Sequence, residues 1–480
     1  MMKRKLFIGI LAGLLTGGAG YGQVKVPRLI SDGMVLQREI PIRVWGWASP
    51  GEKVTVKFGG ETASGETDDR GKWQVVLSPK KAGGPFVMDI NGINHIWLKN
   101  IMVGEVWVCS GQSNMELPME RVKEKYPEII AHSENTAIRQ LRVPQKYDLN
   151  TPHDNLPGAK WESASPATIG SFSAVAYFFA RALNERYHVP VGLITATMGD
   201  ASDEAWLSAE ALRSFPEYTT VAGRNADSTY KPMGLYNGMI APLINYTIRG
   251  VIWYQGEANV TRAKEYQTSF PALITDWRRH WNQGVFPFLF VQLAGYGPVK
   301  DKPEESEIAA LREAQRMALS LPKTGMAVAM DLGEENDIHP LNKEDVGKRL
   351  ALSAEYVAYD AGDMIWTGPL YHSMKIKGGK AHISFKEADR GLIVKGGGEL
   401  HGFEIAGADN HFVPANATID GKNVVIVWSE AVPQPAVVRY AWADNPQGAN
   451  LYNRDILFHD GLPAPSFEGR PKGPSGEIRK

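Results

Sequence analysis

The sequence of 480 residues predicts an α/β fold: a three-layer domain built on a parallel sheet, with an N-terminal and a C-terminal β-sandwich-like region on either side. Between residues 101 and 362, apolar strands alternate with amphipathic helices, which is the pattern of a parallel sheet covered on both faces. Residues 23–100 and 363–480 instead contain short strands separated by turn residues, which favours antiparallel sandwiches. The hydrophobic fraction of 43% and the charged fraction of 22% are ordinary for a folded globular chain.

Local periodicity predicts the individual elements. In the first β region, residues 53–58 place Val54, Val56 and Phe58 on one face of a strand. In the central domain the predicted strands are 102–109, 190–194, 250–254, 286–293 and 326–330, and the predicted helices are 171–187, 239–246, 263–282, 304–319 and 343–359. In the C-terminal region, strands are expected at 380–385, 391–394, 423–428 and 436–440. The proline-rich tail after Leu462 is expected to be a loose extension.

Composition argues against several classes of protein. Lys and Arg number 52 against 53 Asp and Glu, so no basic surplus is present to hold a nucleic-acid backbone. The single cysteine, Cys109, excludes an intrachain disulfide and any cysteine-cluster metal site. No stretch after residue 22 is long and apolar enough to predict a membrane span, so we expect no stable membrane insertion.

Residues 1–22 have the three parts of a secretory signal peptide. The chain starts with Met-Met-Lys-Arg-Lys, continues with a short apolar run from Leu6 to Leu15, and then has small residues up to Gly22. The apolar run is too short to cross a bilayer, which needs about 20 residues. We therefore expect cleavage after Gly22 and a periplasmic or secreted bacterial protein, with an uncleaved membrane anchor as the alternative.

Polar residues follow four of the predicted central strands, and ligands of an open parallel sheet bind beyond the carboxyl ends of its strands. The first such loop is Ser110-Gly-Gln-Ser-Asn-Met, directly after the strand that ends at Cys109. Its Ser113 lies in a glycine-containing turn into a helix, where the hydroxyl is exposed and the N–H can stabilise an oxyanion. Met115 excludes the G-x-S-x-G motif of α/β-hydrolases. A helix cap is the alternative interpretation of this serine.

The second and third loops carry further polar groups. Residues 197–202 include Gly199, where a backbone N–H can come close to a ligand, although a turn glycine is the alternative. Residues 255–259 end an apolar strand with three polar side chains. Glu257 could orient a histidine, and Gln255 or Asn259 could donate to an oxyanion.

The fourth loop, residues 336–340, holds His339 beside Asp337. A histidine fixed before a proline, with a carboxylate next to it, is a candidate general base, and a satisfied loop histidine is the alternative. All four loops are predicted at strand ends of one domain, so a nucleophile, oxyanion donors, a base and an orienting acid would meet. This set of groups is typical of acyl transfer.

Residues 109–115 read Cys-Ser-Gly-Gln-Ser-Asn-Met, residues 253–257 read Trp-Tyr-Gln-Gly-Glu, and residues 337–340 read Asp-Ile-His-Pro. These motifs resemble the sialate O-acetylesterase family of SGNH-type carbohydrate esterases. Supporting matches occur at residues 32–37, 204–206, 235–239 and 438–442, so the similarity extends into both flanking β regions. The resemblance implies an SGNH-hydrolase-like central domain and a carbohydrate O-acetylesterase that needs no metal or organic cofactor.

The resemblance also implies a role for each matching position. Ser113 corresponds to the family nucleophile and His339 to its base. The oxyanion hole would be formed by the N–H groups of Ser113 and Gly199 and by the side-chain amide of Gln255. Apart from the resemblance, contacts with the substrate are expected from Gln112, Asn114, Trp253 and Asn259. For Trp253, a strand residue, a core position is the alternative.

Two positions depart from the family pattern. Asp200 follows Gly199 where many relatives have a second glycine, which adds a carboxylate near the pocket. Asn336 stands three residues before the histidine, where SGNH enzymes usually have the acid. The orienting acid is therefore either Asp337 or Glu257, and both remain open.

The reaction that the resemblance implies is hydrolysis of an acetyl ester on a sugar hydroxyl. O-acetyl sialic acid is the implied substrate, with Arg262 as a candidate cation for its carboxylate, and acetylated xylan or another hemicellulose is the alternative. A glycoside hydrolase that pairs Glu257 with Asp337 would leave the Ser113 loop unexplained. A non-catalytic carbohydrate-binding protein is disfavoured because the motif residues are intact.

Overall fold

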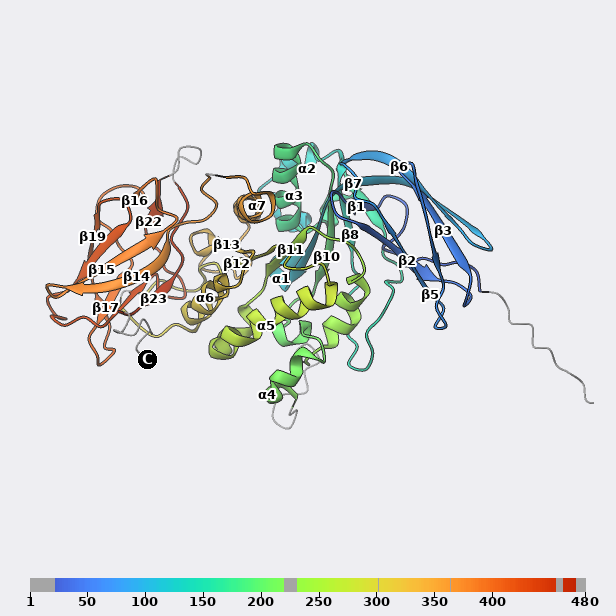
Figure 1. The fold of residues 1–480 in the computed structure, drawn as a ribbon. Coiled ribbons are helices and arrows are strands. Elements are labelled where there is room, and N and C mark those ends of the chain that lie inside the picture. Colours follow the sequence, from blue (N-terminus) through green and yellow to red (C-terminus); the bar gives the residue numbers. More distant parts are fainter. Residues whose placement is uncertain (1–21, 220–230, 301, 363, 455–460, 472–480) are drawn as a thin grey trace, which may run out of the picture.

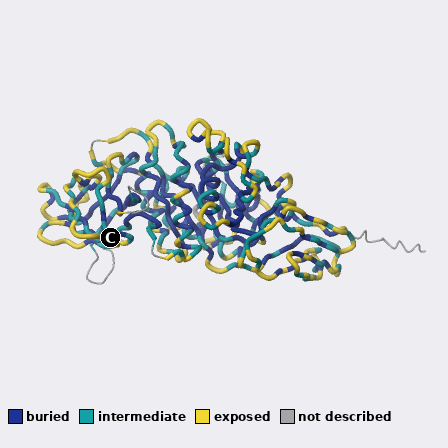
Figure 2. Tube along the Cα trace, turned by 90° about the horizontal axis from the view of Figure 1, so that it is seen from above, coloured by how far each residue is buried: buried dark blue, intermediate teal, exposed yellow. Residues whose placement is uncertain are grey.

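The structure is a computed structural model that describes residues 22–219, 231–300, 302–362, 364–454 and 461–471. It confirms the predicted fold class, with three regions in a row: the N-terminal β region, the central α/β domain and the C-terminal β region (Figure 1). Buried segments run through the central domain and continue into both β regions (Figure 2). The predicted signal peptide lies outside the described residues except for Gly22.

The central sheet has the strand order β13-β12-β11-β7-β10-β8-β9, and all of its pairs are parallel except β8 with β9. The strands are β7 (His95–Gly111), β8 (Asn135–Arg142), β9 (Trp161–Ala164), β10 (Val191–Thr197), β11 (Gly250–Tyr254), β12 (Phe288–Gln292) and β13 (Thr324–Val328). Every strand predicted for this domain forms, and the sheet gains β8 and β9, which were not predicted. In the middle of the sheet, Val108 pairs with Ile194 and Val251. Because the strands are parallel, their carboxyl ends share one edge.

Helices cover both faces of this sheet. The α-helices described in this domain are α1 (Ser113–Glu116), α2 (Pro127–Ala131), α3 (Ala174–Tyr187), α4 (Pro216–Thr219), α5 (Ala263–Trp281), α6 (Glu307–Met317) and α7 (Lys343–Tyr359). The pair α3 and α7 packs on one face and the pair α5 and α6 on the other (Figure 1). Side-chain caps start three of them, at Ser173, Ser306 and Asn342. The helix predicted at 239–246 is instead a π-helical turn, Tyr236–Ile240, followed by a 3₁₀ turn, Ala241–Leu243.

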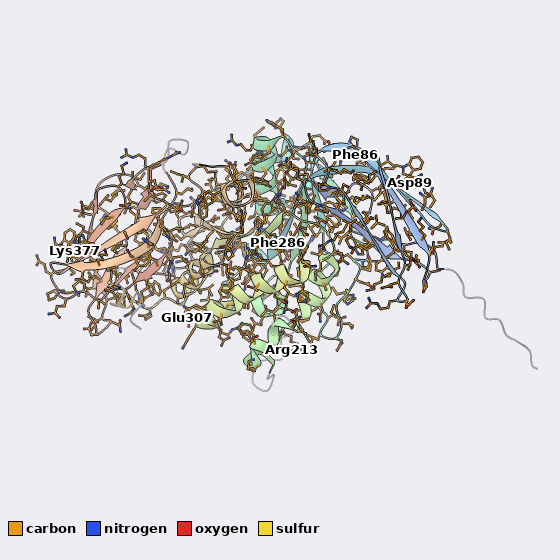
Figure 3. The ribbon with its side chains drawn as sticks, viewed as in Figure 1. Phe86, Asp89, Arg213, Phe286, Glu307 and Lys377 are labelled. Carbon is orange, nitrogen blue, oxygen red and sulfur yellow. The ribbon has the colours of Figure 1, made fainter. Side chains whose placement is uncertain are left out.

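The N-terminal region joins the central domain through the continuous strand β7. Its other strands are β1 (Val35–Gln37), β2 (Ile42–Trp47), β3 (Lys53–Phe58), β4 (Glu61–Glu66), β5 (Lys72–Leu77) and β6 (Gly83–Asn91). β2 pairs with β5, while β3, β4 and β6 form a sheet with the first part of β7. Phe86 lies on β6 (Figure 3). Its ring packs edge-on against that of Phe58 on β3. The predicted boundary at residue 100 falls inside β7.

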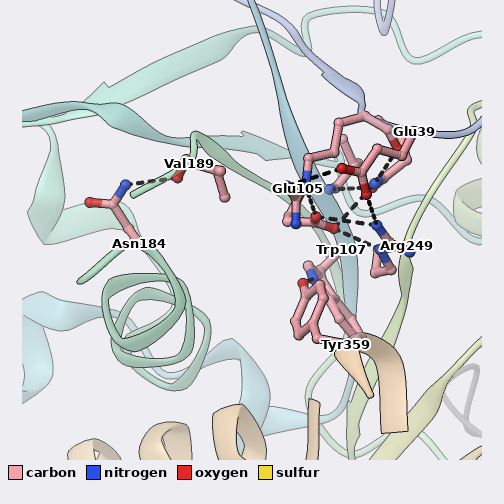
Figure 4. Close-up of polar contacts among 10 residues, drawn as sticks. Glu39, Glu105, Trp107, Asn184, Val189, Arg249 and Tyr359 are labelled. Carbon is pink, nitrogen blue, oxygen red and sulfur yellow. Dashed lines mark hydrogen bonds and ion pairs between the residues drawn. The ribbon is translucent and has the colours of Figure 1, made fainter. Parts of the chain in front are cut away.

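A cluster of charged residues, buried around Glu105, joins the N-terminal region to the central domain at the amino end of the sheet (Figure 4). Glu105 of β7 accepts hydrogen bonds from Gln37, Arg38 and Arg249. Burial alone would raise the pKa of Glu105, but the guanidinium groups of Arg249 and Arg38 hold it below its ordinary value. On the same strand, the indole N–H of Trp107 donates to the hydroxyl of Tyr359 in α7 at 3.2 Å.

The C-terminal region contains two four-stranded antiparallel sheets and a two-stranded one. Its strands are β14 (Leu370–Lys377), β15 (Lys380–Lys386), β16 (Leu392–Val394), β17 (Phe403–Ala406), β18 (Val413–Pro414), β19 (Asn416–Asp420), β20 (Val424–Trp428), β21 (Val437–Tyr440), β22 (Leu451–Asn453) and β23 (Phe467–Gly469). The prediction of a loose tail after Leu462 is wrong for the described residues up to 471. β23 pairs with β21, and Phe467 is fully buried and stacks on Tyr371. Burial of this aromatic side chain fixes the segment despite its prolines.

Candidate active site

The first loop presents Ser113 at the carboxyl edge of the sheet. β7 ends at Gly111, whose φ of +134° suits glycine. A Cβ atom there would lie 2.1 Å from the carbonyl oxygen of Tyr254, so only glycine lets β7 and β11 approach this closely. The chain then turns, and Ser113 becomes the first residue of α1. This turn places the serine hydroxyl beyond the strands.

His339 lies opposite that hydroxyl. It comes from the loop between β13 and α7, and its Nε2 is 2.8 Å from the Oγ of Ser113. Burial and the positive charge of Lys343 lower the pKa of His339 below 6.5, and the negative charge of Asp337 opposes them. The imidazole is therefore neutral near pH 7 and can accept the proton of Ser113.

The two candidate acids occupy different places. Asp337 lies on the far side of the imidazole, with its Oδ1 3.7 Å from Nδ1 of His339, and it also accepts the backbone N–H of His339 at 2.8 Å. Glu257 instead accepts a hydrogen bond from Asn114 at 2.5 Å. Burial raises the pKa of Glu257. Of the two candidates, Asp337 therefore lies beside the imidazole, and Glu257 is held by Asn114.

The second loop lies beside the first. The N–H of Met198 donates to the carbonyl of Gly111 at 3.1 Å. Gly199, the next residue, therefore lies close to the turn that carries Ser113. Asp200 is exposed and adopts a left-handed conformation, with a φ of 56°. Its carboxylate is close enough to raise the pKa of both His339 and Glu257. Asp200, the carboxylate that departs from the family pattern, therefore lies next to the candidate site.

The structure corrects the expectation for Gln255 and Asn259. Both are fully buried, and the Nε2 of Gln255 donates to the carbonyl of Ala201 at 3.2 Å and to Oδ1 of Asn259 at 2.7 Å. Asn259 in turn donates to Asp203 at 2.7 Å. Gly256, with a φ of 155°, turns the chain after Gln255, and the amide lies in the interior, where polar groups need partners. Neither amide is available to an oxyanion or a substrate in this conformation.

Two further residues that were expected to contact the substrate have structural contacts instead. Gln112 is buried, and its Oε1 accepts the N–H groups of Gly256 at 3.2 Å and Ala258 at 3.3 Å, which ties the first loop to the third. Trp253 is fully buried on the face covered by α5. Its ring packs against Trp206, Phe270 and Trp277. Because the indole is enclosed by these rings and has no exposed surface, it cannot stack on a sugar.

Asn114 connects the loops through a residue that the sequence reasoning missed. Its Nδ2 donates to Glu257 and, at 3.0 Å, to the carbonyl of Ile338, while its Oδ1 accepts from Nζ of Lys343 at 2.6 Å. Lys343 has no exposed surface, and burial lowers its pKa to about 8. The available signal was its position: a lysine in the first turn of a helix lies at the positive end of the helix dipole, where a cation is disfavoured.

Arg262, a possible metal site and a membrane-spanning helix are the other features that the sequence raised. Arg262, the candidate cation for a sialate carboxylate, forms ion pairs with Glu204 at 2.8 Å and Glu265 at 3.4 Å. Among the described residues, no three His, Cys, Asp or Glu side chains form a group that could hold a metal ion. In the same part of the chain, no helix has the length and apolar character needed to cross a membrane.

Comparisons with known proteins agree with this arrangement. The family model for carbohydrate esterases described as sialic acid-specific acetylesterase matches residues 103–355, more than half of the chain. Human sialate O-acetylesterase is 30% identical to this chain over 91% of each protein, and the rat enzyme is 28% identical over 97% of each. The crystal structure of a carbohydrate acetylesterase from Xanthomonas citri is 41% identical and superposes with a TM-score of 0.85, covering 93% of this chain and 99% of that one. The chain therefore belongs to the carbohydrate esterase family of sialic acid-specific acetylesterases, which the sequence motifs predicted.

Proposed function

We propose that the protein is a carbohydrate O-acetylesterase that releases acetate from O-acetylated sugars through an acetyl-enzyme on Ser113. The observation that carries this proposal is the 2.8 Å contact between the Oγ of Ser113 and Nε2 of His339 at the carboxyl edge of the parallel sheet. Membership of the esterase family supports the reaction class.

In the first half of the reaction, His339 takes the proton of Ser113 while the Oγ attacks the acetyl carbonyl carbon. The negative charge that develops on the carbonyl oxygen is stabilised by the backbone N–H groups of Ser113 and Gly199. The bond to the sugar oxygen then breaks, and His339 donates its proton to that oxygen. In the second half, His339 deprotonates a water molecule that attacks the acetyl-enzyme, and acetate leaves as Ser113 regains its proton.

The pKa of His339 and the neighbouring carboxylate of Asp337 both suit this cycle. The lowered pKa of His339 keeps the imidazole neutral and able to accept a proton at neutral pH. Asp337, 3.7 Å from Nδ1, stabilises the imidazolium that forms when the proton moves.

The sugar is either an acetylated sialic acid or a neutral acetylated hemicellulose. Two observations favour the neutral class: Arg262 is already paired with Glu204, and Asp200 adds a negative charge beside the site. One favours the anionic class: the exposed guanidinium of Arg121 is close enough to lower the pKa of His339. Acetate release from O-acetyl sialic acid, acetylated xylan and acetylated mannan, compared at equal acetyl concentration, decides between them.

Covalent labelling tests the acyl-enzyme. A serine-reactive phosphonate should form a stoichiometric adduct on Ser113 in the wild type, and the His339→Ala variant should lose most of this labelling. A rival glycoside hydrolase predicts that Ser113→Ala still cleaves deacetylated oligosaccharides, while Glu257→Gln does not. Absence of acetate release from every acetylated sugar would refute the proposed function.

We also propose that residues 1–22 are an export signal and that the enzyme acts in the periplasm or outside the cell. The mass of the protein recovered from the periplasm or medium of a bacterial host tests this, because cleavage after Gly22 predicts a chain that starts at residue 23. Retention of the full-length chain in the membrane would contradict it.

A further inference from the structure

Lys343 is a buried cation between the loops that carry Ser113 and His339. We propose that it is a positioning residue for the esterase reaction: its ammonium group fixes the amide of Asn114, which joins the two loops. This inference rests on the proposed function, and it adds a residue to that site.

The contacts of one amide carry the positional part of the inference. Nζ of Lys343 donates to Oδ1 of Asn114 at 2.6 Å. Because the amide oxygen faces Lys343, the amide nitrogen Nδ2 faces the opposite side. The Nδ2 end then donates to Glu257 and to the carbonyl of Ile338. Asn114 is adjacent to Ser113, and Ile338 is adjacent to His339, so the hydrogen bond between Asn114 and Ile338 fixes the nucleophile relative to its base.

Lys343 occupies a place where an ammonium group is costly. It is fully buried and is the first residue of α7, so both desolvation and the positive end of the helix dipole oppose its charge. The opposing contacts are specific. Besides the contact with Asn114, Nζ of Lys343 lies 5.5 Å from the centroid of the Tyr254 ring. The buried carboxyl group of Glu257 raises the pKa of Lys343 and so favours its charged form. The Oε2 of Glu257 has no hydrogen-bond partner within the described residues, and the charge of Lys343, together with the hydrogen bond from Asn114, lowers the pKa of this buried carboxyl.

The charge of Lys343 also reaches the general base. The charged groups that face Lys343 are Glu257 on the third loop and Asp337 and Glu334 on the fourth. Of the neighbouring charges that change the pKa of His339, Lys343 has the largest effect and lowers it, ahead of Asp337, which raises it. Smaller effects come from Arg121, which lowers this pKa, and Asp200, which raises it. Loss of the ammonium charge should therefore raise the pKa of His339.

The test replaces Lys343 by methionine, which has a similar length and no charge. We expect kcat for acetate release to fall about 10²-fold, because a small displacement of the nucleophile relative to its base costs this much. KM should change little, and the acid limb of kcat/KM should move to higher pH. The matched control is Lys348→Met on the same helix, whose side chain is 49% exposed and pairs with Glu344. It should behave as the wild type.

A second variant guards against misfolding. Lys343→Met leaves Glu257 as a buried unpaired charge, whereas the double variant with Glu257→Gln leaves none, and replacing a buried pair by neutral groups is often tolerated. Glu257 acts on the pKa of His339 less than Lys343 does, so the acid limb should move to higher pH in the double variant too. A folded variant with the wild-type kcat and acid limb would overturn the inference, as would failure of both variants to fold, which would indicate a structural role. Wild type without esterase activity would instead refute the proposed function.

Discussion

Replacing Asp337 by asparagine removes the negative charge nearest to the ring of His339 and changes little else. The side-chain oxygen of asparagine can still accept the backbone N–H of His339, which Asp337 accepts at 2.8 Å, so the loop should keep its conformation. The substitution therefore isolates the electrostatic contribution of the carboxylate to the imidazolium that forms during the reaction.

The magnitude follows from the 3.7 Å between Oδ1 of Asp337 and Nδ1 of His339. Two unit charges at this separation attract by about 4.5 kcal/mol at an effective dielectric constant of about 20 and by about 1 kcal/mol in water. The two side chains are 39% and 32% exposed, so solvent screening favours the lower part of this range. We expect a loss of about 1–2 kcal/mol of transition-state stabilisation, or about 5- to 30-fold in kcat/KM.

The assay is the pH profile of kcat/KM for acetate release, measured for Asp337→Asn and Glu257→Gln. Asp337 raises the pKa of His339, so removing its charge should lower that pKa and shift the acid limb to lower pH. Glu257 hydrogen-bonds to Asn114 and acts on the pKa of His339 less than Asp337 does, so Glu257→Gln should reduce kcat with little movement of the acid limb. Wild-type kinetics in Asp337→Asn, together with a shifted acid limb in Glu257→Gln, would refute this reasoning and identify Glu257 as the orienting acid.

Three further predictions concern the nucleophile, the oxyanion site and the substrate. Ser113→Ala should lower acetate release by at least about 10³-fold without changing the thermal unfolding midpoint. Gln255→Ala should lower the free energy of unfolding in urea by about 1–3 kcal/mol, because the carbonyl of Ala201 and Oδ1 of Asn259 lose a buried donor. A 10²-fold loss of kcat at wild-type stability would instead identify Gln255 as an oxyanion donor. Asp200→Gly, which retains the left-handed backbone, should raise the ratio of kcat/KM for anionic over neutral acetylated sugars about fivefold, since it removes about 1 kcal/mol of repulsion. An unchanged ratio would show that Asp200 does not face the substrate.

The sequence was sufficient to predict the arrangement of the site because parallel sheets restrict where loops meet. Apolar strands ending at Cys109 and Tyr254 can be recognised from hydrophobic runs, and the carboxyl ends of parallel strands share one edge. That rule alone predicted that Ser113 and His339 would lie close together, and their side chains are 2.8 Å apart. The flanking β regions were recognisable for a similar reason, since period-two alternation is a local property.

The direction of individual side chains was not accessible in the same way. Trp253 lies in β11, and Gln255 follows the last residue of that strand. Gln255 was expected to face the pocket, whereas for Trp253 both the pocket and the core were open. A strand alternates its faces, and the turn at Gly256 has an unusual φ, so tertiary packing decides which residues point outward. Phe467 was missed because the neighbouring prolines suggested an extended tail, whereas a single buried ring stacked on Tyr371 fixes that segment.

The two candidate acids were equivalent in the sequence because each lies at a strand end within reach of a histidine. Their surroundings separate them. Asp337 is partly exposed and contacts the ring that must gain and lose a proton, whereas Glu257 is enclosed and contacts the amide of Asn114. Burial raises the pKa of Glu257, and the charge of Lys343, which is also buried, opposes this effect. We therefore predict that the acid that serves the chemistry, Asp337, and the acid that holds the loops in place, Glu257, are different residues.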